Sequence, residues 1–246
     1  MEIATREADA RVEGRPMRVV VSAPRARGRY PGILLYSEIF QLTAPIRRAM
    51  ERLSGHGFVV AAPEIFHRLE PPGTVIAYDD AGRMRAQDDA ARTSTAEFDA
   101  DRRAALDLLD GQPDVATGRL GAMGFCIGGH LAFRAALDPR VKAAVCCYPT
   151  GLHDGRGGRD GDAGSLGLAG EIAGRLLIVF GETDPHVPEE GRWRVAEALA
   201  AADPRHRVAL YPGEHAFMRD EGPRFDAEAA DAVWRETIDL FRSSFS

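Results

Sequence analysis

The sequence predicts an α/β fold in which helices cover both faces of a mostly parallel, twisted β-sheet. Short runs rich in valine, isoleucine and leucine alternate along the chain with amphipathic, helix-like stretches. Strands that are apolar at nearly every position are typical of parallel sheets, because both faces of such a sheet are covered. A chain of 246 residues is also long enough to bury a substantial core.

The expected elements alternate from one end of the chain to the other. We expect strands at residues 17–22, 32–37, 58–62, 119–125, 141–148, 175–180 and 207–211. The first of these runs can pair antiparallel at an edge of the sheet. We expect helices at residues 43–54, 95–109, 128–137, 189–201 and 224–241. Thr43 is suited to cap the first helix, and Pro45 is suited to its first turn.

Two long connections interrupt this alternation, at residues 67–94 and 151–170. The first contains Pro71-Pro72-Gly73, and the second is rich in glycine. Connections of this length in a compact domain are usually functional or disordered. We expect the first to cover part of the functional site and the second to be a mobile surface insertion. Neither has the character of a domain boundary, so residues 1–246 are expected to form a single domain.

The composition is that of an ordinary globular protein, and it excludes several functional classes. The formal net charge is −6 and no basic run occurs, so no nucleic acid partner is expected. The N-terminal residues are polar and no apolar stretch approaches membrane-spanning length, so no membrane partner is expected either. Cys146 and Cys147 are adjacent on a predicted strand, where their side chains point to opposite faces. With three cysteines in all, a reduced cytoplasmic protein is the simplest interpretation.

The segment Gly124-Phe125-Cys126-Ile127-Gly128-Gly129 is the most informative part of the chain. It joins a predicted strand directly to a predicted helix, and so sharp a turn leaves the corner residue strained, with its side chain pointing outward. Glycines on both sides make room for the crossing backbone. The pattern matches the nucleophile elbow G-x-S-x-G with cysteine in place of serine. The alternative is a buried structural cysteine beside a glycine-rich strand end.

A thiol nucleophile needs an imidazole to take its proton and a carboxylate to orient that imidazole. Such partners should follow later strands, because the ligand crevice of an open parallel sheet lies at the carboxyl ends of its strands. Asp184 and His215 meet this expectation, since they follow the last two predicted strands. Glu182 competes for the role of the acid. His186 competes for that of the base, although it lies only two residues from Asp184.

Four segments together resemble the signature segments of the dienelactone hydrolases, also called carboxymethylenebutenolidases. They read Glu-Ile-Phe, Gly-Phe-Cys-Ile-Gly-Gly, Gly-Glu-Thr-Asp-Pro-His-Val-Pro and Gly-Glu-His-Ala-Phe-Met-Arg, at residues 38–40, 124–129, 181–188 and 213–219. The resemblance implies an α/β-hydrolase fold and the hydrolysis of a lactone or ester through a Cys-His-Asp triad. It also implies that Glu38 contacts the resting thiol and helps to control its ionisation. No metal or other cofactor is expected, because neither His-Glu-x-x-His nor Cys-x-x-Cys occurs.

Position by position, the resemblance implies Cys126 as nucleophile, His215 as base and then acid, and Asp184 as the residue that orients His215. The backbone N–H groups of Ile127 and Ile39 would form the oxyanion hole. Independently of the resemblance, the α/β-hydrolase fold takes these donors from the residue after the nucleophile and from a loop after an early strand.

The resemblance also implies residues that bind the substrate. Arg219 fits a family arginine that engages both the early glutamate and an anionic substrate. A second family arginine, on the first long connection, corresponds to Arg83 or Arg85, and the spacing leaves both open. Phe40 and Tyr148 complete the expected set. For the arginines the alternative is a solvated surface charge.

Two positions and one loop depart from the family pattern. Cys147 stands where the family has a tyrosine, Ser37 stands where it has a glutamine, and residues 151–170 enlarge a loop. We expect a hydrolase that cleaves a small lactone or activated carboxylic ester, dienelactone-like and anionic, through a cysteine thiolate and an acyl-enzyme. The alternative is a general carboxylesterase or thioesterase with the same triad. A non-catalytic protein that binds a small ligand and a redox-sensing thiol are further alternatives from other classes.

Overall fold

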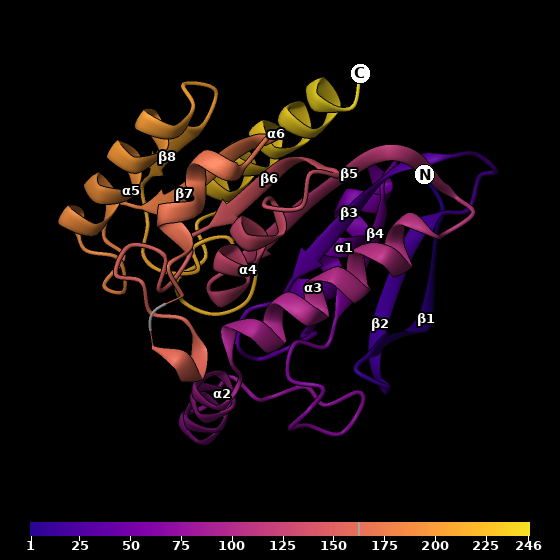
Figure 1. Ribbon diagram of the computed structural model, residues 1–246, viewed down its shortest axis with the longest axis horizontal. Helices are drawn as coiled ribbons and strands as arrows, with labels where there is room; N and C mark the ends of the chain where they lie inside the picture. The colour runs from indigo at the N-terminus through magenta and orange to yellow at the C-terminus, as the bar shows by residue number, and fades with distance from the viewer. Residues whose placement is uncertain (162) are drawn as a thin grey trace.

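One sheet organises the part of the chain that this computed structural model describes, residues 1–161 and 163–246 (Figure 1). The antiparallel pairs are the first strand with the second and the second with the fourth, and the other neighbours are parallel. In spatial order the strands are β1 (Ile3–Val12), β2 (Arg15–Pro24), β4 (Val59–Pro63), β3 (Tyr30–Tyr36), β5 (Val115–Phe125), β6 (Val141–Cys147), β7 (Arg175–Gly181) and β8 (Arg207–Tyr211).

Helices cover both faces of this sheet, which confirms the predicted fold class (Figure 1). The α-helices of the described residues are α1 (Ala44–Gly55), α2 (Asp80–Arg92), α3 (Thr95–Asp110), α4 (Ile127–Ala135), α5 (Glu189–Ala202) and α6 (Ala227–Ser244). The core on one face includes residues of α1 and α6, and the core on the other includes residues of α3, α4 and α5. Cys147 belongs to the first core and Cys146 to the second, so these neighbours point to opposite faces as predicted.

The first predicted run, now β2, is not the edge of the sheet, because β1 lies outside it. The two strands are joined by a tight turn in which Glu13 and Gly14 have φ angles of 49° and 82°. Positive φ at both central residues is typical of the turns that close a two-residue hairpin. Most side chains of β1 alternate between exposed and partly buried positions. The strand therefore lacks the continuous apolar run by which the others were recognised.

The first long connection is not a loop throughout, because α2 forms within it. Asp79 caps this helix, and its side chain accepts a hydrogen bond of 2.7 Å from the backbone N–H of Gly82. Of the residues in α2, only Gly82, Ala86 and Asp89 are buried. The helix thus lacks the apolar stripe by which amphipathic helices are predicted. In Figure 1 it lies beneath the main body of the protein.

The second long connection is hydrogen bonded to the residues that join α2 to α3. The N–H of Arg159 donates to the carbonyl oxygen of Thr93 at 2.9 Å, and the hydroxyl of Thr95 donates to that of Gly157 at 3.1 Å. Short 3₁₀ helices form at Gly158–Asp160 and Ser165–Glu171. The segment predicted to be a mobile insertion therefore packs against its neighbours. Asp162, which belongs to that predicted insertion, lies outside the described residues.

Candidate active site

Cys126 stands at the corner between β5 and α4, in a backbone conformation that few residues other than glycine adopt. Its φ is 58° and its ψ is −122°. A Cβ atom on Gly124 would lie 1.9 Å from the carbonyl oxygen of Gly128, and one on Gly128 would lie 2.3 Å from that of Ser37. The glycines are therefore required where the turn crosses itself and where it meets the segment after β3. Strain of this kind costs about 1–3 kcal/mol and is concentrated at functional sites.

The thiol of Cys126 is partly exposed, whereas Cys146 and Cys147 are fully buried. The backbone N–H of Cys126 donates to the carbonyl oxygen of Cys147 at 3.0 Å, which fixes the corner to β6. The sulfur lies 3.7 Å from the hydroxyl oxygen of Thr150. The thiol also sits at the N-terminal end of α4, where the helix dipole favours an anion.

His215 and Asp184 follow β8 and β7 and meet at the same edge of the sheet. The Nδ1–H of His215 donates to Oδ2 of Asp184 at 2.8 Å, and the two residues are 6% and 3% exposed. The other oxygen of Asp184 accepts from the backbone N–H of His186 at 2.8 Å. Since Nδ1 is engaged, Nε2 is the ring nitrogen that is free to face the sulfur. Of the two candidate acids, Asp184 is the one hydrogen bonded to His215, while Glu182 is exposed.

The charges of the site strongly favour an imidazolium at position 215. Burial acts to lower the pKa of His215, but the charge of Cys126 and the hydrogen bonds to Asp184 and Cys126 outweigh it and raise that pKa to about 10. Burial likewise acts to raise the pKa of Asp184, but the hydrogen bond and charge of His215 outweigh it and lower that pKa. The three side chains are therefore coupled electrostatically.

Two rings flank the imidazole of His215. The centroid of His186 lies 4.6 Å from that of His215 with the planes at 78°, and the centroid of Tyr148 lies 5.1 Å away at 67°. Burial lowers the pKa of His186, and the charge of His215 adds to the effect. His186, the rival candidate for the base, packs edge-on against His215. Tyr148, the ring predicted to touch substrate, is 1% exposed and packs edge-on against His215.

Glu38 is buried just beyond the end of β3. Its carboxylate accepts a hydrogen bond from the hydroxyl of Tyr78 and lies 3.7 Å from Nη1 of Arg219. The guanidinium of Arg219 stacks over the ring of Tyr78, 4.3 Å from its centroid. Burial raises the pKa of Glu38, although Tyr78 and Arg219 act in the opposite direction. The structure thus joins Glu38 to the predicted Arg219 and to Tyr78, which the sequence prediction missed.

Of the other predicted site residues, Phe40 contacts Tyr78, and the two arginines of α2 contact carboxylates. Phe40 packs edge-on against Tyr78, with ring centroids 4.7 Å apart. Arg83 pairs with Asp80 on the exposed face of α2, and Arg85 pairs with Glu70. The two arginines therefore already have carboxylate partners of their own.

The predicted oxyanion donors occupy suitable elements. Ile127 is the first residue of α4, where a backbone N–H has no acceptor within the helix. Ile39 follows Glu38 in the segment after β3. Gly128 packs against the carbonyl oxygens of Tyr36 and Ser37, which brings the start of α4 against that segment.

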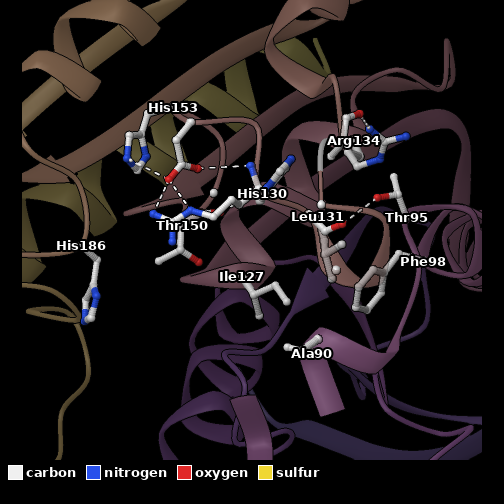
Figure 2. Close-up of a pocket in the computed structure, with 18 of the residues that line it drawn as sticks. Ala90, Thr95, Phe98, Ile127, His130, Leu131, Arg134, Thr150, His153 and His186 are labelled. Atoms are coloured by element: carbon white, nitrogen blue, oxygen red, sulfur yellow. Dashed lines mark hydrogen bonds and ion pairs between the residues drawn. The ribbon is translucent and has the colours of Figure 1, made fainter. Parts of the chain in front are cut away.

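A cavity of about 440 Å³ is lined by Ile127, the residue after Cys126, and by Thr150, whose hydroxyl lies 3.7 Å from the sulfur (Figure 2). We call it the α2/α4 cavity. Its lining includes Ala90, Ala91, Phe98, Ile127, His130, Leu131, Arg134, Thr150, His153, Asp154, Arg156, Gly157, Ala163 and His186. A second hollow of about 130 Å³ lies between α1 and α6 and is lined in part by Glu38, Tyr148 and Arg219.

Thr150 and Tyr78 are the site residues that sequence reasoning missed. Thr150 follows β6, so the rule that ligand sites lie at the carboxyl ends of strands could have found it. Tyr78 lies in a connection without an apolar pattern, and no local signal points to it.

The described ranges 1–161 and 163–246 contain no cluster of three or more histidine, cysteine or acidic residues placed to hold a metal ion. Within those same ranges, no helix has the length and apolar character needed to cross a membrane.

Comparison with known proteins places the chain in a family. The model of the dienelactone hydrolase family matches residues 17–245. A Saccharomyces cerevisiae protein named provisionally as a carboxymethylenebutenolidase is 34% identical over 224 residues, which cover 87% of this chain and 82% of that protein. A Synechocystis protein with the same provisional name is 30% identical over 224 residues, which cover 91% of this chain and 90% of that protein.

Solved structures agree on the fold. A crystal structure from Klebsiella pneumoniae, described provisionally as a dienelactone hydrolase, matches with a TM-score of 0.84 and 24% identity, covering 98% of this chain and 99% of the other. This likeness shows the α/β-hydrolase fold, and the family model spans nearly the whole chain. The chain therefore belongs to the dienelactone hydrolase family and is a hydrolase of the lactone or carboxylic ester type.

Proposed function

We propose that the protein hydrolyses a lactone or activated ester through the thiolate of Cys126 and a thioester intermediate. The observation that carries this proposal is the imidazole of His215, which is hydrogen bonded to Asp184 and coupled to a thiol at a strained, glycine-lined corner. A thiolate is the attacking form of cysteine, and a neighbouring imidazolium stabilises it.

In the first step the sulfur attacks the ester carbonyl carbon, and the π electrons of the carbonyl move to its oxygen. The N–H groups of Ile127 and Ile39 would hold this oxyanion, since each such donor is worth about 2.7–4 kcal/mol of the barrier. When the tetrahedral intermediate collapses, the C–O bond to the leaving group breaks. The imidazolium of His215 donates its proton to that oxygen, and a thioester on Cys126 remains.

In the second step neutral His215 takes a proton from water, and the resulting hydroxide attacks the thioester. Collapse breaks the C–S bond and releases the acid, and the thiolate–imidazolium pair is restored. Asp184 keeps the tautomer of His215 correct in both steps. A thiol suits activated esters with good leaving groups better than amides, so we do not expect peptidase activity.

Anion recognition by Arg219 is the finer part of the proposal. The side chain of Arg219 is 17% exposed, and its guanidinium lies beside the buried carboxylate of Glu38. A substrate carboxylate could share this guanidinium. Arg83 and Arg85 would first have to leave Asp80 and Glu70.

The replacement of Cys126 tests the mechanism. Cys126→Ala should lower hydrolysis of an aryl acetate by several orders of magnitude, and native protein should release one equivalent of aryl alcohol in a burst. Iodoacetamide should label one thiol and abolish activity, because Cys146 and Cys147 are fully buried. Undiminished turnover by the alanine variant would exclude the mechanism, and binding of a lactone without any burst would support a ligand-binding role instead.

A second candidate, a general carboxylesterase or thioesterase with the same triad, is favoured by the size of the α2/α4 cavity. A volume of about 440 Å³ falls within the range of sites for small organic ligands. Rates for a dienelactone, short aryl esters and thioesters, compared at one pH, separate the two candidates. Preference for the anionic lactone supports the role of Arg219, and indifference to substrate charge removes it.

We also propose that the protein works in the reducing environment of the cytoplasm. Its three cysteines are all free thiols. A nucleophilic thiol remains active only where it stays reduced.

A further inference from the structure

The α2/α4 cavity is lined by two neighbours of the reacting thiol and by neither Glu38 nor Arg219. Thr150, whose hydroxyl lies 3.7 Å from the sulfur, and Ile127, the residue after the thiol, both line it. Glu38 and Arg219 line the other hollow and are not part of this lining. A group bound to the sulfur can therefore extend in a direction that avoids the anion-binding arginine.

We propose that the α2/α4 cavity holds an uncharged, apolar acyl arm of the ester substrate. This inference rests on the proposed function, because it assigns the acyl group that Cys126 would carry as a thioester. The leaving group must face His215, which protonates it, whereas the acyl group stays on the sulfur and needs the space beside Ile127 and Thr150.

One wall of the cavity is apolar and comes from three helices. Ala90 belongs to α2, Phe98 to α3, and Ile127 and Leu131 to α4. Phe98 and Leu131 are each 6% exposed, and Ala90 and Ile127 are partly buried against the same core. In Figure 2 these four side chains lie to the right of Thr150 and His153.

The opposite wall comes from the segment that the sequence marked as an insertion. Gly157, which has no side chain, and Ala163, which has only a methyl group, line the cavity here, so this wall does not fill the space. The segment is held in place by the hydrogen bond from Thr95 to Gly157 and by that from the N–H of Ala163 to the carbonyl oxygen of Gly155 at 2.7 Å. These hydrogen bonds hold the enlarged loop where it forms one wall of the cavity.

The arginines among the described lining residues are already paired. Arg134 makes two hydrogen bonds to Asp99, of 3.0 Å and 2.5 Å, and donates to Ser165 at 2.8 Å. Arg156 donates from Nε to Asp154 at 2.6 Å. Each guanidinium already has a carboxylate partner, so a substrate carboxylate here would compete with Asp99 or Asp154.

The histidines of the lining are neutral near pH 7. Burial and the charge of Arg134 lower the pKa of His130 to about 4, although its backbone hydrogen bond to Thr150 opposes them. Burial also lowers the pKa of His153 and of His186. A carboxylate placed here would lose hydration and would meet only arginines that already have carboxylate partners, which disfavours a charged arm.

These features set the expected selectivity. Each methylene group buried in the cavity should improve binding about fourfold, because its apolar surface is removed from water. A hexanoyl ester should therefore exceed an acetyl ester in kcat/KM by at least about tenfold. An ester of the same length that ends in a carboxylate should lose that advantage.

The test compares 4-nitrophenyl acetate, 4-nitrophenyl hexanoate and the mono-4-nitrophenyl ester of adipic acid on the full chain. Ala90→Phe fills the cavity from α2, and Ala91→Phe does so from a more exposed position that tolerates substitution. Ala81→Phe is the matched control, because Ala81 is exposed on the same helix and does not line the cavity. Thermal unfolding establishes that each variant is folded.

Both filling variants should lower the hexanoate-to-acetate ratio of kcat/KM at least about tenfold, and Ala81→Phe should keep the parent ratio. An unchanged ratio in the folded variants would overturn the inference, and so would an adipate ester hydrolysed as fast as the hexanoate. Cys126→Ala separates the two levels of the argument. If Cys126→Ala still hydrolyses the acetate ester, the proposed mechanism fails. If Cys126→Ala is inactive but the hexanoate-to-acetate ratio is unchanged in the filling variants, only the assignment of the cavity fails.

Discussion

Replacement of Cys126 by serine should lower the pKa of His215 by more than one unit. The ring is 6% exposed, and the sulfur and Asp184 together raise its pKa from 6.5 to about 10 against the effect of burial. That shift corresponds to about 5 kcal/mol in favour of the imidazolium, because one unit is worth about 1.4 kcal/mol. Serine does not ionise at these pH values, so the variant loses the charge of the thiolate, the largest effect that raises this pKa. Asp184 alone then opposes the burial of the ring.

Nuclear magnetic resonance of the histidine ring nitrogens measures this change directly. We expect His215 of the parent protein to remain an imidazolium until the pH approaches 10, and His215 of Cys126→Ser to lose its proton at a lower pH. Alkylation of the parent protein with iodoacetamide should have the same effect, since it also removes the thiolate. Agreement between the two perturbations would identify the charge of the sulfur as the cause.

His56 serves as the internal control. It lies at the end of α1, and its lowered pKa has burial and the charges of Arg242 and Arg52 as causes, none of which involves the active site. Its titration should be the same in all three samples. Titration of His215 near 6.5 in the parent protein, or an unchanged pKa in the serine variant, would refute the thiolate–imidazolium pair.

Three further substitutions test other parts of the site. Asp184→Asn should lower kcat by about 10²- to 10⁴-fold with a smaller effect on thermal stability, and rates equal to those of the parent would remove Asp184 from the triad. Gly128→Ala should destabilise the protein by about 1–3 kcal/mol in denaturant unfolding, because its Cβ would lie 2.3 Å from a backbone oxygen, whereas Gly170→Ala, with open space around it, should be nearly neutral. Tyr78→Phe removes a hydrogen bond that lowers the pKa of Glu38, so the acidic limb of the kcat/KM–pH profile should move to higher pH. An acidic limb at the same pH as in the parent protein would show that the ionisation of Glu38 does not control the reaction.

The parts of the site that were predictable from sequence are those whose geometry is specified locally. The turn at Cys126 needs glycine at positions 124 and 128 because backbone atoms pass within 2.3 Å of their missing Cβ atoms, and that requirement is visible as a motif. Asp184 and His215 were predicted because each follows a predicted strand, and parallel strands end at a common edge. Such rules need no knowledge of distant contacts.

The parts that were not predictable depend on tertiary contacts without a periodic pattern. Tyr78 reaches Glu38 across forty positions of sequence, from a connection that lacks an apolar stripe. β1 and α2 escaped recognition because their side chains are largely exposed. The arginines of α2 illustrate the same limit: Arg85 pairs with Glu70, a partner that spacing alone does not reveal.

The electrostatics of the proposed mechanism make the acidity of His215 change in step with the reaction. In the resting pair the charge of the thiolate stabilises the imidazolium and raises the pKa of His215 to about 10, so His215 is then a poor acid. When the sulfur bonds to the acyl carbon, it loses its charge, and the largest effect that raises the pKa of His215 disappears. The imidazolium then becomes a stronger acid at the moment when the leaving group needs a proton. The neutral base that results can activate water, and loss of the acyl group restores the thiolate and the proton affinity of the ring.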